Sequence, residues 1–172
     1  MKALCMVAHP DDCVIFGYSY IHNHPEYDWT IGYLTYTESD VRGSELAAFW
    51  RRRNIPTVFL GYVDDYHDLE TGQLSFDSVR AEQDIQQLTQ RYDLVLTHDE
   101  RGDYGHLHHV FVHRCVQTHQ RLVTFAGANS GNVRLSIPAG TYSLSELPGH
   151  RDIISGFFPN VVHENNYTEV AK

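Results

Sequence analysis

The chain has 172 residues, 42% of them hydrophobic, which suits one well-packed domain better than two, so we expect a single domain over residues 1–172. Its net charge of −9, from 22 acidic and 13 basic residues, argues against broad electrostatic binding of nucleic acid or anionic lipid. Three cysteines without paired spacing favour a cytoplasmic location over a disulfide framework, and no apolar run approaches the roughly 18 residues of a membrane span.

Short apolar runs alternate with helical patterns along the first two thirds of the chain. Four runs rich in β-branched or aromatic residues predict strands at residues 2–8, 29–35, 55–60 and 93–97. Apolar residues recur at helical spacing over residues 44–53 and 78–91. This alternation predicts right-handed βαβ crossovers and an α/β fold, a three-layer sandwich with a mainly parallel sheet.

The last third of the chain gives a less regular pattern. Residues 132–137 and 141–144 predict strands, and residues 145–158 predict a helix broken near Pro148 and Gly149. Residues 127–131 are rich in glycine and small polar residues and predict a loop.

The first predicted strand ends in His9-Pro10-Asp11-Asp12. Ligands of α/β sheets bind beyond the carboxyl ends of the strands, and here one imidazole and two carboxylates lie within four residues. His9 and Asp12 can bind one metal while Asp11 faces a water on it. An aspartate pair before an apolar segment can also cap the next helix. The two interpretations are compatible, and we leave both open.

A second group of histidines and aspartates follows the strand predicted at residues 93–97. It consists of His98, Asp99, Asp103, His106, His108, His109 and His113. Because two strand ends that carry such residues can meet over one cleft, this placement favours a metal site over a chance surface run. His109 and His113 have the i, i+4 spacing of two ligands on one helix face, but the Glu of the HExxH pattern is absent. For His113 we favour a packed or exposed helix residue.

The two segments resemble the signature motifs of the LmbE/PIG-L family of zinc-dependent de-N-acetylases, in AHPDDC at residues 8–13 and GDYGHLHH at residues 102–109. RGSE at residues 42–45 is similar to the family's Arg-x-x-Glu segment, and FLGYVDD to its following strand and loop. The resemblance covers about residues 3–116. It implies a Rossmann-like fold and removal of an acetyl group from N-acetylglucosamine units.

The resemblance also implies a role for each matching residue. His9, Asp12 and His109 would bind zinc or iron, Asp11 would be the general base, and His106 would stabilise or protonate the tetrahedral intermediate. Three protein ligands leave an open coordination position, where a metal can bring the pKa of its water towards about 7 and polarise the amide carbonyl. The products would be acetate and a free amine.

Two further residues are candidates for substrate binding. The resemblance implies that Arg42 contacts the substrate, and its guanidinium suits sugar hydroxyls or a phosphate oxygen. Alternatively, Arg42 pairs with Glu45 at i, i+3 near a helix start. Tyr104, close to His106 in the sequence, is a candidate for stacking on a sugar face. We expect a small amino-sugar substrate, and the oligomeric state is open, a homo-oligomer included.

The chain departs from the family pattern at three positions. Cys13 stands where Glu is usual, Leu107 where Pro is usual, and His108 where Asp is usual. We expect Cys13 to be a small buried residue rather than an added metal ligand. An Asp at position 108 would support a cationic His106, which a histidine cannot do. An altered pH optimum or substrate is therefore a reasonable hypothesis.

Our leading hypothesis is a metal-dependent hydrolase that deacetylates an N-acetylglucosamine-type amino sugar or its conjugate. One alternative is a catalytically silent module that binds a glycan or a nucleotide, and another is an amidase for a different acyl amide. Asp11 favours an enzyme, since a pure binder needs no base beside the metal. The lack of G-x-G-x-x-G after the first strand argues against a dinucleotide-dependent oxidoreductase.

Overall fold

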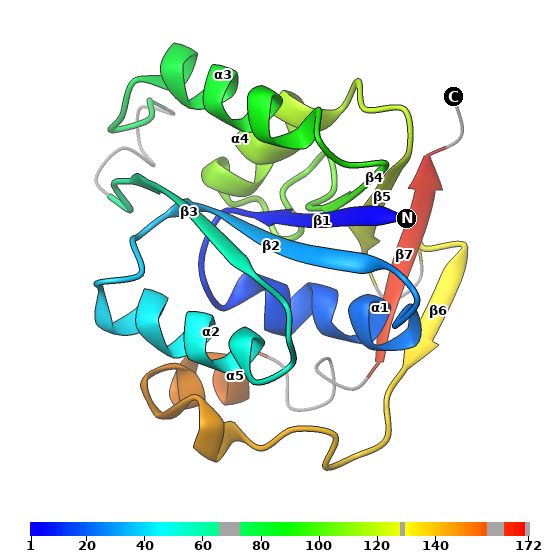
Figure 1. Ribbon diagram of the computed structural model, residues 1–172. Coiled ribbons are helices and arrows are strands. Elements are labelled where there is room, and N and C mark those ends of the chain that lie inside the picture. The colour runs from blue at the N-terminus through cyan, green and yellow to red at the C-terminus, as the bar shows by residue number, and fades with distance from the viewer. Residues whose placement is uncertain (66–72, 128–129, 158–163, 171–172) are drawn as a thin grey trace.

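The computed structural model describes residues 1–65, 73–127, 130–157 and 164–170. Over these residues a seven-stranded sheet has the order β3-β2-β1-β4-β5-β7-β6 (Figure 1). The five strands from β3 to β5 in that order are parallel, and β7 runs antiparallel to both β5 and β6. The strands are β1 (Lys2–Val7), β2 (Asp28–Thr35), β3 (Thr57–Tyr62), β4 (Leu94–Thr97), β5 (Leu122–Ala126), β6 (Val133–Ser136) and β7 (Glu164–Val170).

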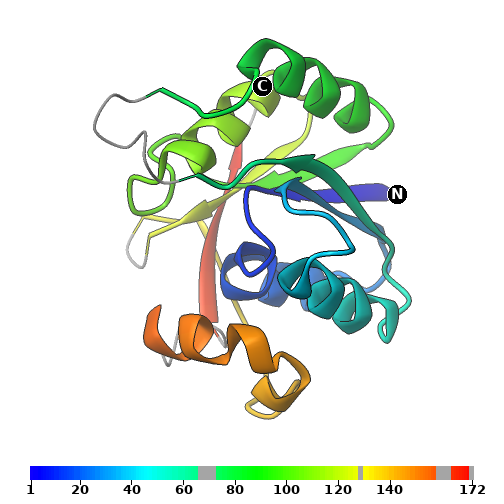
Figure 2. The same ribbon diagram turned by 90° about the vertical axis from the view of Figure 1, so that its left-hand side faces the viewer.

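Helices cover both faces of the sheet, which makes the three layers of an α/β sandwich. In Figures 1 and 2, α3 and α4 lie on one face, and α1, α2 and α5 on the other. A π-helical turn, Cys13–Gly17, leads directly into α1. The helices are α1 (Tyr18–Asn23), α2 (Val41–Arg51), α3 (Ser78–Thr89), α4 (Leu107–Val116) and α5 (Arg151–Phe157). No helix in the described part of the chain is long and apolar enough to cross a membrane.

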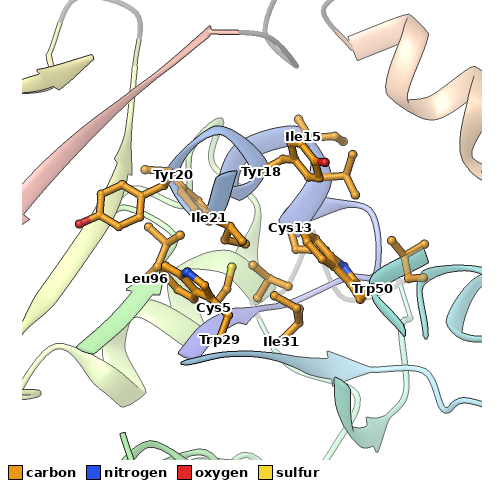
Figure 3. Packing of buried hydrophobic residues seen from close by; sticks show 14 of the residues in the cluster. Cys5, Cys13, Ile15, Tyr18, Tyr20, Ile21, Trp29, Ile31, Trp50 and Leu96 are labelled. Carbon is orange, nitrogen blue, oxygen red and sulfur yellow. The ribbon is translucent and has the colours of Figure 1, made fainter. Parts of the chain in front are cut away.

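The apolar runs become strands because both of their faces are covered. Ala3, Cys5 and Val7 of β1 pack into one hydrophobic cluster, and Leu4 and Met6 into the other. The first cluster lies between the sheet and α1 and α2, and Figure 3 shows its side chains, Trp29 and Trp50 among them. The second lies under α3 and α4, whose apolar stripes include Ile85 and Val112. A continuous rather than alternating apolar pattern is the signature of such a doubly covered sheet.

The structure confirms the α/β sandwich and most of the predicted elements. The four predicted strands correspond to β1 to β4, residues 132–137 contain β6, and the two predicted helices correspond to α2 and α3. No range was predicted for α1, α4, β5 or β7, although the i, i+4 spacing of His109 and His113 indicated a helix where α4 lies. The described residues of the predicted loop, Gly127, Ser130 and Gly131, lie outside helices and strands, whereas residues 128–129 are outside the described part.

One predicted strand is wrong and one predicted helix is shorter than expected. Residues 141–144 form no strand, because Ser143 and Glu146 make a capping box that starts a 3₁₀ turn at Leu144–Glu146. A second 3₁₀ turn, Pro148–His150, precedes α5, so the chain breaks where proline and glycine indicated. Phe158, the predicted end of this helix, lies outside the described residues.

The pairing of β1 with β4 brings together the two polar segments that follow them. Met6 pairs with Thr97, and the Thr97 hydroxyl donates to the Met6 carbonyl at 2.7 Å. One step further, the Ala8 N–H donates to Nε2 of His98 at 3.0 Å. The residues after both strands therefore start from one fixed edge of the sheet.

We predict that Gly43→Ala lowers the free energy of unfolding by about 1–3 kcal/mol through overpacking, because a Cβ there would overlap the backbone carbonyl of Thr37. Gly156→Ala is the matched control, since a Cβ at this helical position meets nothing within 4 Å, and it should stabilise the protein by about 0.5–1 kcal/mol. Urea titration of the two variants measures both effects. Equal stability of the two variants would contradict the close approach of Gly43 in α2 to the Thr37 carbonyl.

Candidate metal centre

Three buried side chains bring their donor atoms together beyond the ends of β1 and β4. Nδ1 of His9 lies 3.1 Å from Oδ2 of Asp12 and 3.2 Å from Nε2 of His109, and the latter two atoms are 3.3 Å apart. Ligands bound at about 2.0–2.1 Å around a tetrahedral ion are about 3.3–3.4 Å from one another. The donor types and their spacing therefore fit a divalent metal ion.

Further His and Asp side chains extend this cluster. Three overlapping groups have ligand atoms within 4.8 Å of one another: His9, His106 and His109; His9, Asp64 and His108; and Asp12, His98 and His109. Every group contains His9 or His109, so these two imidazoles lie at the centre of the whole cluster. The described residues thus offer several His/Asp combinations for a divalent ion.

The turn at residues 9–12 aims its side chains by hydrogen bonds within itself. The His9 N–H donates to Oδ2 of Asp12 at 2.7 Å, and the Asp11 carbonyl accepts the N–H of Val14 at 2.9 Å. No side-chain cap precedes the π-helical turn that follows. The capping alternative is therefore wrong for Asp12, whose carboxylate turns back towards the two histidines.

A carboxylate stands behind each of the two histidines. Oδ2 of Asp103 accepts from Nδ1 of His109 at 2.8 Å and also from Nδ1 of His98. Oδ1 of Asp64 lies 3.3 Å from Nε2 of His9. The bond to Asp103 keeps the proton of His109 on Nδ1, so that Nε2 offers its lone pair to a metal. Nε2 of His9 has Nδ1 of His108 at 3.1 Å as its hydrogen-bond partner, and Asp64 adds a nearby negative charge. The sequence analysis did not identify Asp64 as a site residue. Its position just after β3 was an available signal, because the HPDD segment likewise follows the end of a strand.

The glycine before Asp103 makes this approach possible. Gly102 and Asp103 both have left-handed backbone conformations, with φ of 72° and 64°. A Cβ at Gly102 would lie 2.6 Å from the carbonyl oxygen of His106 and 2.8 Å from Val110, so only glycine fits without a shift. The GDYG segment is therefore shaped to carry Asp103 beneath the histidines.

The buried carboxylates require positive charge. Burial by itself would lower the pKa of His9, but Asp12 and Asp64 raise it to about 10. Burial likewise opposes a charge on His109, whereas Asp12 and Asp103 raise its pKa to about 9. The pKa of Asp103 falls to about 2 despite burial, because His98 and His109 lie beside it. Without a metal, protons on the imidazoles supply the charge, and a divalent cation can supply it in their place.

Asp11 lies beside this cluster and is held by an arginine. Nη2 of Arg42 donates to Oδ1 of Asp11 at 2.8 Å, and Nη1 donates to the Tyr36 hydroxyl at 2.8 Å. Burial and the neighbouring Asp12 raise the pKa of Asp11, which Arg42 partly offsets. The alternative pairing of Arg42 with Glu45 is wrong, since Glu45 binds the backbone N–H of Gly149 at 2.8 Å.

His106 caps α4 with its own ring. Its Nδ1 accepts from the backbone N–H of His108 at 3.2 Å, which leaves the proton of the neutral ring on Nε2. Burial, followed by the nearby His9 and His109, lowers the pKa of His106 to about 3. The pKa of His108 falls to about 4 for similar reasons. Both rings are therefore neutral at pH 7.

A cavity of about 360 Å³ opens over these groups. Its lining combines polar side chains, Asp11, Arg42 and His106 among them, with the apolar Phe16 and Ile153. The lining residues are His9, Asp11, Asp12, Ile15, Phe16, Arg42, Tyr104, His106 and Ile153. Tyr104 is 52% exposed at the rim. His113 is not among the residues that line this cavity. Its Nδ1 forms a hydrogen bond of 2.9 Å with the His98 carbonyl, as expected of a packed helix residue.

A family model described as PIG-L, GlcNAc-PI de-N-acetylase, matches residues 4–119. The chain belongs to this family. The matched range contains both polar segments and Arg42, whereas β5, β6, the 3₁₀ turns, α5 and β7 lie beyond it. No curated protein matches the sequence significantly.

Solved structures with different activities share the PIG-L fold of this chain. N,N'-diacetylchitobiose deacetylase from Pyrococcus horikoshii has a TM-score of 0.68 at 15% identity, over 98% of this chain and 83% of that one. GalB, the 4-carboxy-2-hydroxymuconate hydratase from Pseudomonas putida, has a TM-score of 0.64 at 15% identity, over 99% and 96%. The zinc-inhibited form of teicoplanin deacetylase Orf2 has a TM-score of 0.64 at 11% identity, over 99% of both chains. At these identities the similarity shows the fold alone.

Cys13, a departure from the PIG-L pattern, points into the core. Its Sγ contacts the Pro10 carbonyl at 3.2 Å and the Tyr33 hydroxyl at 3.1 Å, and accepts from Nε1 of Trp50 at 3.2 Å. Figure 3 shows Cys13 against Trp50. Burial raises its pKa to about 12, so the side chain is a thiol. The expected role as a small buried residue is confirmed.

We predict that Asp103→Asn weakens zinc binding by about 10- to 100-fold, because the outer nitrogen of His109 loses its carboxylate partner. Competition with a fluorescent chelator measures this affinity. Glu100→Gln removes a charge from an exposed neighbour and should leave the affinity unchanged. An Asp103→Asn protein that binds zinc as tightly as the Glu100→Gln protein would refute the supporting role of Asp103.

Proposed function

We propose that this chain is a metal-dependent hydrolase that removes the N-acetyl group from an N-acetylglucosamine-type amino sugar or its conjugate. The observation that carries the proposal is the meeting of His9, Asp12 and His109 within 3.1–3.3 Å, with Asp11 held beside them by Arg42. Membership in the family described as GlcNAc-PI de-N-acetylase supports both the reaction class and an N-acetylglucosamine-type substrate, and deacetylases are among the structures that share the fold. A base placed next to the ligands favours a hydrolase over a silent binding module.

The proposed ligands are His9, Asp12 and His109, with Asp64 and Asp103 fixing the two imidazoles. A zinc or iron ion held there supplies Lewis acidity, which polarises an acyl oxygen and brings the pKa of water towards about 7. The ligand set of two nitrogens and one oxygen suits either metal.

Asp11 acts as the proton carrier in this proposal. It accepts a proton as the water oxygen bonds to the acyl carbon, and passes that proton to the amine nitrogen as the C–N bond breaks. Acetate and a free amine result. Burial raises the pKa of Asp11, which strengthens it as a base, and a correctly placed base contributes about 10²–10⁴-fold in rate. Its contact with Arg42 fixes the direction of the carboxylate.

His106 stabilises the developing oxyanion as a neutral hydrogen-bond donor. The backbone N–H of His108 occupies Nδ1, so the neutral ring carries its proton on Nε2, and His106 is one of the residues that line the cavity. A donor aimed at such an oxygen contributes about 10²–10³-fold in rate. Tyr104 and Arg42, which both line the cavity, are the proposed contacts for the sugar.

We predict that ligand and base substitutions have different effects. Asp12→Ala and His109→Ala should lose the single bound metal, whereas Asp11→Asn should keep it and lower kcat by about 10²–10⁴-fold. Elemental mass spectrometry gives the metal content, and amine release from N-acetylglucosamine and N,N'-diacetylchitobiose gives the rate. His22→Ala, at an exposed histidine, should change neither. Wild-type protein that takes up no metal would reject the proposal, and release of amine only from other acyl amides would redirect it to that substrate class.

We predict that His108→Asp introduces a new pH dependence. His106 has a pKa of about 3, so it stays neutral through the working range and adds no fall in kcat/KM at higher pH. A carboxylate at position 108 would raise this pKa and favour the cationic ring. The cationic ring is the stronger donor to an oxyanion, so kcat/KM of this variant should be higher below the raised pKa and fall towards the level of the neutral ring as the pH rises through it, which gives a descending alkaline limb. His108→Asn, without added charge, should show the wild-type profile, and identical profiles for both variants would contradict the assignment.

A further inference from the structure

A segment beyond the family-matched range contacts the side chain that holds the base. The 3₁₀ turn Pro148–His150 and helix α5 follow residue 119 by some distance in the sequence, and they lie next to α2 (Figure 1). Leu147, His150 and Ile154 are almost fully buried. The segment is thus part of the packed molecule, and His150 is a fully buried polar side chain within it.

Glu45 anchors this turn at two points. Its carboxylate accepts the backbone N–H of Gly149 at 2.8 Å and Nδ1 of His150 at 2.8 Å. A Cβ at Gly149 would lie only 2.9–3.2 Å from the carboxyl group, so the close approach depends on glycine. This contact accounts for the Glu of the RGSE segment, which turns away from Arg42.

The anchor fixes the tautomer of His150. Because Nδ1 donates its proton to Glu45, Nε2 of the neutral ring carries a lone pair. That atom accepts from Nε of Arg42 at 3.4 Å. The imidazole therefore bridges a carboxylate on one side and a guanidinium on the other, with both of its nitrogens used.

Arg42 is held at all three of its nitrogens. Nη2 donates to Asp11, Nη1 to the Tyr36 hydroxyl, and Nε to His150. A guanidinium is planar and rigid, so the contact at Nε sets the plane in which the other two groups can donate. Without it, only the two contacts at the terminal nitrogens remain, and the guanidinium can tilt about its last single bonds.

We propose that His150 is a positioning residue for the hydrolysis, which acts by fixing the guanidinium plane of Arg42 and thereby the direction of the Asp11 carboxylate. This inference rests on the proposed function, in which Asp11 carries the proton. It gives the C-terminal segment a role at the site, although no residue of the turn touches the proposed metal ligands in the contacts described. Misplacement of a catalytic group by about 1 Å can reduce the rate on the order of 100-fold.

Two amide side chains separate positioning from anchoring. His150→Asn places its amide where Nδ1 was and can still donate to Glu45, but it does not reach Arg42. His150→Gln reaches the position of Nε2 and can accept from Arg42. If His150 acts through Arg42, the Gln variant should resemble wild type and the Asn variant should lower kcat by about 10- to 100-fold, with KM within about threefold. A residue that serves only to anchor the turn would show the opposite order.

A second readout is independent of the substrate. The Nε–H signal of Arg42, assigned through its loss in Arg42→Lys, reports solvent exchange by ¹H–¹⁵N NMR. Exchange should be slow in wild type and in His150→Gln, and at least about tenfold faster in His150→Asn, since a hydrogen-bonded N–H exchanges only when it opens. Metal content should be equal in all three proteins.

These outcomes distinguish the two proposals. Unchanged exchange and unchanged kcat in His150→Asn would overturn the role of His150 while leaving the hydrolase intact. A wild-type protein that releases amine from no probe would reject the hydrolase and the catalytic consequence with it, whatever the exchange rates. Should His150→Asn fail to fold, His150→Gln decides, because fast exchange and reduced kcat in that variant contradict the proposal.

Discussion

The demand for positive charge among buried carboxylates shapes the whole site. Asp12, Asp64 and Asp103 are drawn out of water around His9 and His109, and burying unpaired carboxylates would be strongly unfavourable. The raised pKa values of the two histidines are the response of the protein alone. A divalent ion would satisfy the same demand with greater charge in less space, so the charges that must be balanced here are also those of the candidate metal site.

The parts of the site predictable from the sequence are those encoded within a few neighbouring residues. HPDD and GDYGHLHH each place several donors on one turn, and the rule that parallel strand ends share an edge brings the two turns together. Strands β1 to β4 were predictable because doubly covered strands are apolar throughout. Local chemistry and one topological rule therefore predicted that the two polar segments meet, and the family resemblance selected His109 and His106 from the second segment.

The missed features depend on distant partners. Nothing near Asp64 or His150 in the sequence reveals that one supports His9 and the other Arg42, since these pairs are 55 and 108 residues apart. Helical spacing predicted the pairing of Arg42 with Glu45. Instead, Arg42 donates to Asp11, and Glu45 accepts from Gly149. Strand β7, with Asn165 and Asn166 at its centre, lacks the apolar run that identified the others. Tertiary contacts decided these cases against local pattern.

The place of β7 in the sheet also bears on how the protein folds. Among the described strands β6 pairs only with β7, which lies between it and β5. β6 therefore cannot join the sheet during synthesis until residues 164–170 have emerged, and the turn that carries His150 lies in the connection between these two strands. Long-range pairings of this kind form late and slowly. The support for Arg42 would then be assembled last, on a sheet whose candidate metal ligands are already in place.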